Sequence, residues 1–332
     1  MAKTKTKSKA SKAEIIRRRE RNSRIARRVG SFFGGPIERR IERRLLKQAW
    51  VHAKPENLKG YLVSGMQNPV INVQSILARH ELIRELDGEK HEGLMEEELS
   101  WAVEKNRDLG KRRQELVREH GTDFKAIKRS GKWQEAYDEV MSDGQPYAEA
   151  WKKALQAGPE ASRTSVIEAA CGSANDYRFF DSYGLAERVD YTGIDITEAN
   201  IENCRKMFPG VDFRVGDVQD LPAADNSYDW AVAHDLLEHL SPSAFNRAID
   251  EFCRVSRRGV IISFFYMRDT PEHTITPRRF YHMNELSRAR IEERFAKYVS
   301  KVEWVEIKPM LAERYDFDGY YNQRAWTMIA RH

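Results

Sequence analysis

The sequence predicts an α/β protein in which a mostly parallel sheet of seven strands follows a helical N-terminal region. Two observations carry this prediction. Up to about residue 156, apolar residues recur at helical spacing and the Val- and Ile-rich runs typical of strands are sparse. After Arg163, seven short apolar runs appear, and helical patterns separate the first five, as in parallel sheets built from strand–helix–strand units.

The seven runs fix the expected strands. They cover residues 165–169, 191–195, 212–215, 230–233, 260–265, 302–307 and 326–330. Helices are expected near 198 and at 243–256, between consecutive strands. In the N-terminal region, helices are expected at about 73–86, 96–120, 123–141 and 146–156, and the expected breaks fall at Gly88, Gly110, Gly121 and Gly144.

Charge divides the chain into a basic end and a mildly acidic remainder. Residues 1–47 contain 17 Lys or Arg and 4 Glu, a local balance of +13, whereas the remaining 39 basic and 47 acidic residues give −8. We expect residues 1–35 to form a basic, largely disordered tail, followed by a helical region at 36–156. Within 13–28 a basic helix could form, and Pro36 suits the first turn of an amphipathic cationic helix.

Three interpretations of the basic end remain open: binding to RNA or DNA phosphates, contact with an anionic membrane surface, or a solvated tail. Phe32, Phe33, Ile37 and Ile41 beside the arginines favour the membrane surface slightly. No run approaches the roughly 18 apolar residues of a transmembrane helix. The three cysteines lack the paired spacing of metal sites, so we expect no metal and a cytoplasmic location, with peripheral membrane attachment as an alternative.

The turn after the first strand has the composition of a nucleotide-binding loop. The segment VIEAACGSAND runs from the strand end at Glu168 through Ala170, Gly172 and Ala174 into a helix. Small residues let the backbone approach a ligand, and the following helix presents its N-terminus. The methyl groups of the two alanines are acceptable only if both residues have negative φ.

An acidic residue follows the second strand at the separation expected for ribose recognition. Asp195 ends the segment YTGIDIT, about 20 residues beyond Gly172, and is followed by Ile196. A carboxylate at this separation can accept hydrogen bonds from two ribose hydroxyls. The alternative is that Asp195 only caps the next helix.

Four segments, in order and spacing, resemble class I S-adenosylmethionine-dependent methyltransferases: the 166–176 loop, 191–197, 211–222 and 228–240. The resemblance covers about half of the chain and implies a Rossmann-like domain at 163–332, with an antiparallel last strand and S-adenosylmethionine as cofactor. It implies that Asp217 binds the adenine amino group and that Val218 covers the ring edge. His234 and Asp235 would lie near the methyl group. Ala170 and Ala174 replace the outer glycines of the family loop.

The acceptor is less well specified. The fourth strand lacks the Asn/Asp-Pro-Pro-Tyr/Phe motif of nucleobase and amide methyltransferases. Histidine can act as a base near neutral pH, so His239 is a candidate for deprotonating a hydroxyl, or it may only pack the next helix. Residues 68–83, 170–180 and 272–282 resemble methyltransferases of bacterial glycan and polysaccharide biosynthesis, and this resemblance ranks sugar-like or lipid-linked acceptors first. The expected reaction is methylation, at oxygen, of a small-molecule or glycan-type acceptor. The alternatives are an RNA methyltransferase that docks substrate through the basic end, and a catalytically inactive binding protein with this fold.

Overall fold

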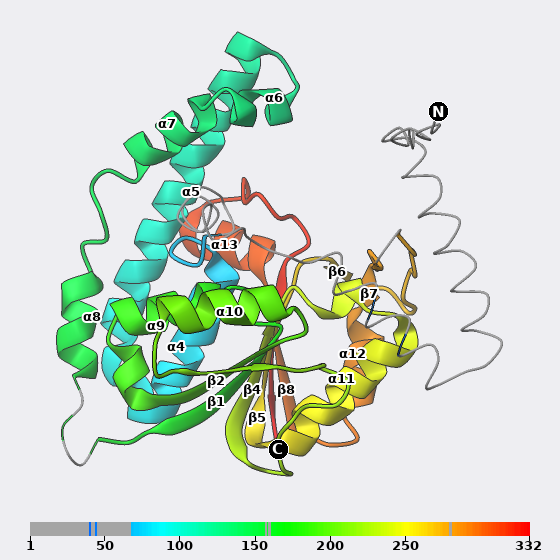
Figure 1. Cartoon of the computed structure of the whole chain (residues 1–332). Coiled ribbons are helices and arrows are strands. Elements are labelled where there is room, and N and C mark those ends of the chain that lie inside the picture. The colour runs from blue at the N-terminus through cyan, green and yellow to red at the C-terminus, as the bar shows by residue number, and fades with distance from the viewer. Residues whose placement is uncertain (1–39, 41–43, 45–67, 157, 159–160, 279–280) are drawn as a thin grey trace, which may run out of the picture.

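The structure, a computed structural model, describes residues 40, 44, 68–156, 158, 161–278 and 281–332. The basic tail and the helices expected before residue 68 lie outside the described residues. Within them, the chain forms a central sheet with helices on both faces and a helical arm that extends away from it (Figure 1).

The N-terminal helices are α4 (Val73–Asp87), α5 (Glu92–His120), α6 (Phe124–Arg129), α7 (Lys132–Val140) and α8 (Ala148–Leu155), with a short 3-10 turn, η2 (Gly88–His91). Two expectations were wrong. The helix expected at 123–141 is split into α6 and α7 because Gly131 lies between them with a left-handed φ of 85°. Gly110 does not interrupt α5, since a glycine inside a helix costs only about 1 kcal/mol.

The sheet confirms the predicted fold class. Its strands are β1 (Thr164–Ala169), β2 (Val189–Asp195), β3 (Asp212–Val215), β4 (Tyr228–His234), β5 (Ser256–Phe264), β8 (Lys301–Glu306) and β9 (Trp326–Arg331). They are arranged in the order β3-β2-β1-β4-β5-β9-β8. The first five pair in parallel, and β9 runs antiparallel to both β5 and β8. The chain order reverses direction between β1 and β4, where doubly wound sheets bind their ligands.

Successive residues of the strands enter two hydrophobic cores on opposite faces of the sheet. Val166 of β1 packs into the first core and Ile167 into the second, and Ile261 and Ile262 of β5 alternate in the same way. The first core is covered by α4, α9 (Asn175–Ser182) and α10 (Glu198–Met207), and the second by α11 (Pro242–Val255) and α12 (Arg288–Phe295). Near-continuous burial along the strands is the expected pattern for a sheet covered on both faces.

Helix α4 belongs to the layer that covers the sheet, although it comes from the N-terminal helical region. Gln74 is buried, and its Nε2 donates to the backbone oxygens of Phe264 at 3.0 Å and Trp326 at 2.7 Å. These carbonyls belong to paired residues of β5 and β9 at the edge of the sheet where β5 ends. The first turn of α4 is thereby fixed beside the carboxyl ends of the parallel strands.

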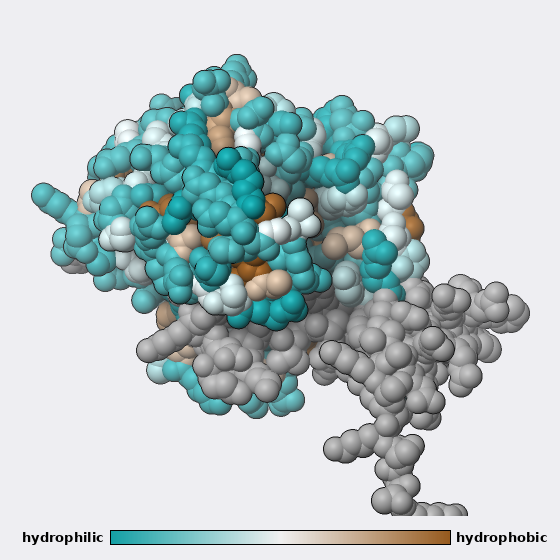
Figure 2. Space-filling model, turned by 90° about the horizontal axis from the view of Figure 1, so that it is seen from above, coloured by the Kyte–Doolittle hydropathy of each residue, from teal (hydrophilic) through white to brown (hydrophobic). Residues whose placement is uncertain are grey.

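The remaining elements close the edges of the sheet. They are η3 (Leu185–Arg188), η4 (Leu237–His239), α13 (Ile307–Tyr315) and a small parallel pair, β6 (Met267–Arg268) with β7 (Leu286–Ser287). Between β6 and β7, the described residues form isolated bridges, Thr274 with Glu285 and Pro277 with His282. No helix in the described part of the chain is long and apolar enough to cross a membrane. From above, the surface is largely hydrophilic with small hydrophobic areas (Figure 2).

Candidate active site

A cavity of about 370 Å³ lies at the carboxyl ends of the parallel strands. Its volume is in the range of small-molecule sites. Ten of the eleven residues singled out from the sequence line it: Glu168, Ala170, Gly172, Asp195, Ile196, Asp217, Val218, His234, Asp235 and His239. The eleventh, Ala174, does not line the cavity. It is fully buried at the N-cap of α9.

The loop after β1 holds an unexpected backbone conformation. Ala170 has a φ of 63° and Ala174 a φ of 60°, so the expectation that both have negative φ was wrong. Gly172 between them also has a positive φ, of 57°. A non-glycine residue in this region costs roughly 1–2 kcal/mol because its Cβ approaches the carbonyl oxygen. The loop therefore keeps the strained geometry of a glycine-rich turn, even though two of its residues are alanines.

Asp195 is held by backbone and side-chain donors at the tip of β2. Its Oδ2 accepts from the Gly172 amide at 3.1 Å, and its Oδ1 accepts from the Thr197 amide at 2.7 Å and from Asn200 Nδ2 at 3.2 Å. Asp195 therefore ties the β1 loop to the start of α10, and it also lines the cavity. Burial raises the pKa of Asp195 to about 6, against the opposing effect of these donors.

Asp217 and Val218 follow β3, the next strand of the sheet. Asp217 Oδ1 accepts from the Gln219 amide at 2.9 Å, which fixes the turn after the strand. Asp217 and Asp195 line the same cavity, as expected for two acidic residues at the tips of neighbouring parallel strands. Their carboxylates therefore share one cleft with the small-residue loop of β1.

Further carboxyl groups gather across the ends of β1 and β4. Asp176, in the first turn of α9, lines the cavity between Glu168 and Asp235, and no hydrogen-bond partner among the described residues reaches its buried Oδ1. Burial, together with Asp176 and Asp195, raises the pKa of Glu168 to about 8. Burial, Glu238 and Asp176 raise the pKa of Asp235 well above its usual range. The cavity thus concentrates acidic groups whose ionisation a cationic ligand would favour.

The end of β4 positions two histidines. His234 Nδ1 lies 2.9 Å from Ser263 Oγ, and its Nε2 lies 3.8 Å from Asp176 Oδ1. His239 Nδ1 donates to the carbonyl oxygen of His282 at 3.2 Å, because a carbonyl can only accept. In a neutral His239 ring the lone pair therefore lies on Nε2. Asp235, which follows His234, adopts a φ of 48°. Strained conformations of this kind are common at functional sites.

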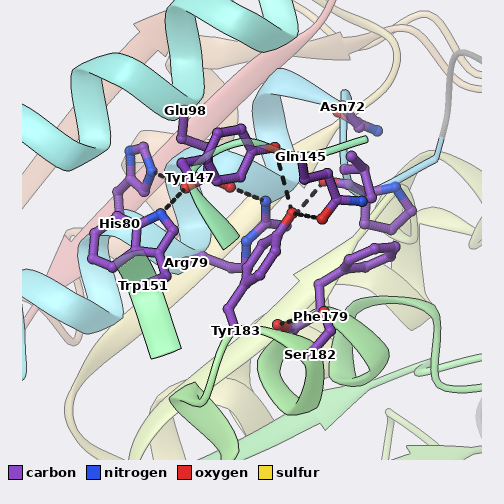
Figure 3. Close-up of polar contacts among 12 residues, drawn as sticks. Asn72, Arg79, His80, Glu98, Gln145, Tyr147, Trp151, Phe179, Ser182 and Tyr183 are labelled. Atoms are coloured by element: carbon purple, nitrogen blue, oxygen red, sulfur yellow. Dashed lines mark hydrogen bonds and ion pairs between the residues drawn. The ribbon is translucent and has the colours of Figure 1, made fainter. Parts of the chain in front are cut away.

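The wall opposite the strands comes from the start of α4. Pro69, Asn72 and Ser75 line the cavity, and Asn72 caps α4 by accepting from the Gln74 amide at 3.0 Å. The carbonyl oxygen of Pro69 accepts from Nη1 of the buried Arg79 at 3.0 Å. Arg79 also lies over the rings of Phe179 and Tyr183 on the α9 side of the cavity, as Figure 3 shows.

Arg79 is neutralised by Glu98 of α5. Its Nη2 lies 2.8 Å from Glu98 Oε1, and Glu98 Oε2 accepts from Trp151 Nε1 at 3.0 Å and lies 2.8 Å from His80 Nε2 (Figure 3). Despite burial, Arg79 and His80 lower the pKa of Glu98 to about 2. This buried cluster connects α4, α5 and α8 behind the cavity wall.

Several lining residues were not anticipated from the sequence. They are Pro69, Asn72, Ser75, Cys171, Asn175, Asp176, Leu236, Leu240, Phe265 and Met283. Asp176 had a signal, since it immediately follows the small-residue loop, whereas Asn72 was recognisable only as a helix cap. Arg278, in the segment between β6 and β7, is exposed and does not line the cavity. No cluster of three or more His, Cys, Asp or Glu residues suited to a metal occurs in the part of the chain that the structure describes.

The strand order, the loop after β1 and the two acidic strand tips define a doubly wound protein built around a nucleotide-type cleft. Residues 166–259 match the family model of a methyltransferase domain. A Mycolicibacterium smegmatis protein named "probable S-adenosylmethionine-dependent methyltransferase" is 33% identical over 142 residues, which cover 39% of this chain and 48% of that protein.

Two further relatives carry more specific names. The phthiotriol/phenolphthiotriol dimycocerosates methyltransferase of Mycobacterium tuberculosis is 32% identical over 109 residues, which cover 32% of this chain and 39% of that protein. The fatty-acid O-methyltransferase of Mycolicibacterium smegmatis is 33% identical over 124 residues, which cover 37% of this chain and 42% of that protein. The chain spans less than half the length of each of these relatives.

The family match shows a methyltransferase domain within residues 166–259, and the sheet has the strand order expected from the resemblance to class I S-adenosylmethionine-dependent methyltransferases. S-adenosylmethionine is the methyl donor named for the first of these relatives.

Proposed function

We propose that the protein transfers a methyl group from S-adenosylmethionine to an oxygen of a small-molecule acceptor, with the cofactor bound in the cavity at the strand ends. The observation that carries the proposal is that Asp195 and Asp217 line one cavity together with the β1 loop. Asp195 would accept hydrogen bonds from the ribose hydroxyls, and Asp217 from the adenine amino group. Ile196 and Val218, which follow them, would pack against the adenosyl group.

The chemistry of the lining fits this cofactor. Asn175 Oδ1, Asp176 Oδ1 and Asp235 Oδ1 are buried acceptors with no hydrogen-bond partner among the described residues, and all three residues line the cavity. Such acceptors are costly unless a donor reaches them. The ammonium and ribose hydroxyls of S-adenosylmethionine are donors, and its positive charge would favour the ionised forms of Glu168 and Asp235. The backbone of Gly172 leaves room for close approach of the amino-acid end.

S-adenosylmethionine supplies an electrophilic methyl group on a positively charged sulfur. In transfer to a hydroxyl, the carbon–sulfur bond breaks with its electron pair left on sulfur, a carbon–oxygen bond forms, and the hydroxyl proton leaves. His239 lines the cavity, and its hydrogen bond to His282 places the neutral lone pair on Nε2. We assign His239 as the base that takes this proton. His234 and Asp235, at the end of β4, would lie beside the transferred methyl group.

The name of one relative, a fatty-acid O-methyltransferase, supports oxygen as the accepting atom. A glycan-type acceptor, the more specific expectation from the sequence, has no support from these names and stays a prediction. The third alternative, an inactive protein with this fold, predicts that no cofactor binds. Calorimetric titration of the full chain with S-adenosylmethionine separates it from an active enzyme.

The decisive variant is Asp195→Ala. We expect it to weaken S-adenosylmethionine binding by at least about 100-fold, because the ribose loses its acceptors and the β1 loop loses its tie to α10. Asp190→Ala is the matched control, since Asp190 lies on the same strand with its side chain 64% exposed. Calorimetry measures affinity, and circular dichroism checks that both variants fold. Unchanged affinity in a folded Asp195→Ala variant would refute the assigned cofactor site.

A further inference from the structure

The order of strands divides the cavity into two ends. The lining residues that match the cofactor pattern follow β1, β2 and β3, which form one side of the sheet: Glu168, Gly172, Asp195 and Asp217 are among them. The other lining residues follow β4 and β5 or come from the start of α4. Since β4 and β5 lie on the opposite side of β1 from β2 and β3, this second end is where an acceptor would meet the methyl group.

The second end combines an apolar lining with the polar side chains of Asn72, Ser75, His234 and His239, and it has no Lys or Arg among the described residues. Its lining includes Pro69, Leu236, Leu240, Phe265 and Met283. The charged group at this end is the carboxyl of Asp235, whose buried Oδ1 has no hydrogen-bond partner among the described residues. Among the residues that the structure describes, no Lys or Arg lines any part of the cavity.

Two arginines lie near these lining residues in the sequence, but neither places a positive charge in the cavity. Arg79 is buried and pairs with Glu98 (Figure 3), and its Nη1 donates to the Pro69 carbonyl oxygen. Arg278, in the segment that leads to Met283, is exposed and is not part of the lining. An anion bound beside Asp235 would therefore meet no Lys or Arg among the described residues of these walls, and only His234 and His239 could supply a counter-charge.

We infer that the acceptor is an uncharged hydroxyl compound with an apolar body, and that a free carboxylate is excluded from this end of the cavity. This inference rests on the proposed function and names its substrate class. The fatty-acid O-methyltransferase is named for an acceptor with a carboxyl group, so the inferred acceptor class of this chain differs from that of this relative.

Electrostatics gives the expected size of the discrimination. Two unit negative charges 4 Å apart repel by about 4 kcal/mol at an effective dielectric constant of 20. If Asp235 is protonated instead, the acceptor carboxylate still loses its hydration without gaining a cation. A hydroxyl carries no such penalty and can hydrogen-bond to the Asp235 carboxyl. Allowing for water at the mouth of the cavity, a tenfold preference for the hydroxyl form is a conservative expectation.

The test uses the full chain saturated with S-adenosylhomocysteine, titrated at pH 8 with 1-octanol and with octanoate. These ligands have equal chain length and differ in the group that would accept the methyl. We expect 1-octanol to bind at least tenfold more tightly. Met283→Lys places a cation at the apolar end and should strengthen octanoate binding at least fivefold without strengthening 1-octanol binding. Met283→Leu, which preserves size without charge, should leave the preference unchanged.

Equal or tighter binding of octanoate to the unaltered protein overturns the inference, as does binding of neither ligand up to its solubility limit. The affinity for S-adenosylhomocysteine is measured first, so two failures are distinguishable. If the nucleoside binds and 1-octanol does not, only the acceptor class is wrong. If the nucleoside itself does not bind, the proposed function fails, and this inference fails with it.

Discussion

Ala170 and Ala174 show how the first loop keeps its shape without the usual glycines. Both residues adopt positive φ, where the methyl group of alanine is strained. Strain of this kind persists only where surrounding contacts determine the conformation, and here Asp195 accepts from the Gly172 amide between them. The contacts that shape the cavity therefore offset the conformational strain of the two alanines.

Substitution of Ala170 measures this strain directly. Ala170→Gly should raise the free energy of unfolding by about 0.5–1 kcal/mol, because relief of the left-handed strain exceeds the added freedom of the unfolded chain. Ala170→Val should lower it by about 2 kcal/mol or more, since a branched side chain fits positive φ poorly. Urea unfolding of both variants gives the two values. Stabilisation by valine would contradict the backbone geometry.

Glu168 predicts a pH dependence of the cofactor-free protein. Its pKa is raised to about 8 in the folded state, above the roughly 4.3 of an unfolded chain. A carboxyl group whose pKa is raised by folding stabilises the fold fully at pH values below its pKa in the unfolded chain. This stabilisation is lost as the pH rises through its pKa in the folded state. Between pH 4 and pH 8, ionisation of Glu168 should therefore lower the free energy of unfolding by about 4 kcal/mol.

Glu168→Gln should remove this contribution, so that the variant loses less stability over the same pH range. Glu187→Gln, at an exposed glutamate of η3, provides the control and should follow the unaltered protein. Urea unfolding at several pH values supplies the comparison. Parallel pH curves for all three proteins would show that Glu168 ionises normally in the fold.

At the scale of elements, the buried cluster around Glu98 fixes α4, and α4 supplies one wall of the cavity. Glu98 interacts with Arg79 and His80 of α4 and with Trp151 of α8. Arg79 in turn holds the carbonyl of Pro69. Helices far from the strand ends in sequence thus set the position of Pro69, Asn72 and Ser75.

Removal of the Glu98 charge should be costly. Glu98→Gln leaves the Arg79 guanidinium buried without its counter-charge, and we expect a loss of about 3–5 kcal/mol in the free energy of unfolding. Glu96→Gln breaks an ion pair with Arg314 whose two side chains are about half exposed, and it should cost less than about 1 kcal/mol. Urea unfolding compares the two variants. Equal small losses would mean that the cluster contributes little net stability.

At the scale of the whole molecule, we expect cofactor binding to be independent of the basic N-terminal end. Every described residue of the cavity lies at position 69 or later, so deletion of residues 1–35 should change S-adenosylmethionine affinity by less than about twofold. The same deletion should weaken binding to phosphatidylserine vesicles in a salt-dependent manner, since each basic residue near such a surface contributes about 1 kcal/mol. Vesicle sedimentation and calorimetry measure the two effects. Loss of cofactor affinity on deletion would place the tail in the site.

The sequence by itself determined the sheet and the positions of Asp195 and Asp217. Local pattern suffices there, because parallel strands align their carboxyl ends at one edge, so residues at successive strand tips meet without further information. It also indicated Gly172 and the small-residue loop, but the positive φ of Ala170 and Ala174 could not be read from side-chain identity, since alanine favours negative φ.

Only the tertiary structure decided which residues line the cavity opposite the cofactor end. Asn72 and Met283 are separated by more than two hundred residues, yet both line the cavity. The pairing of Arg79 with Glu98 likewise depends on how α4 packs against α5, and the place of α4 beside the sheet depends on the bonds of Gln74 to β5 and β9. Such contacts arise from the burial of whole helix faces, and burial is a property of the assembled layers, which no short stretch of sequence specifies.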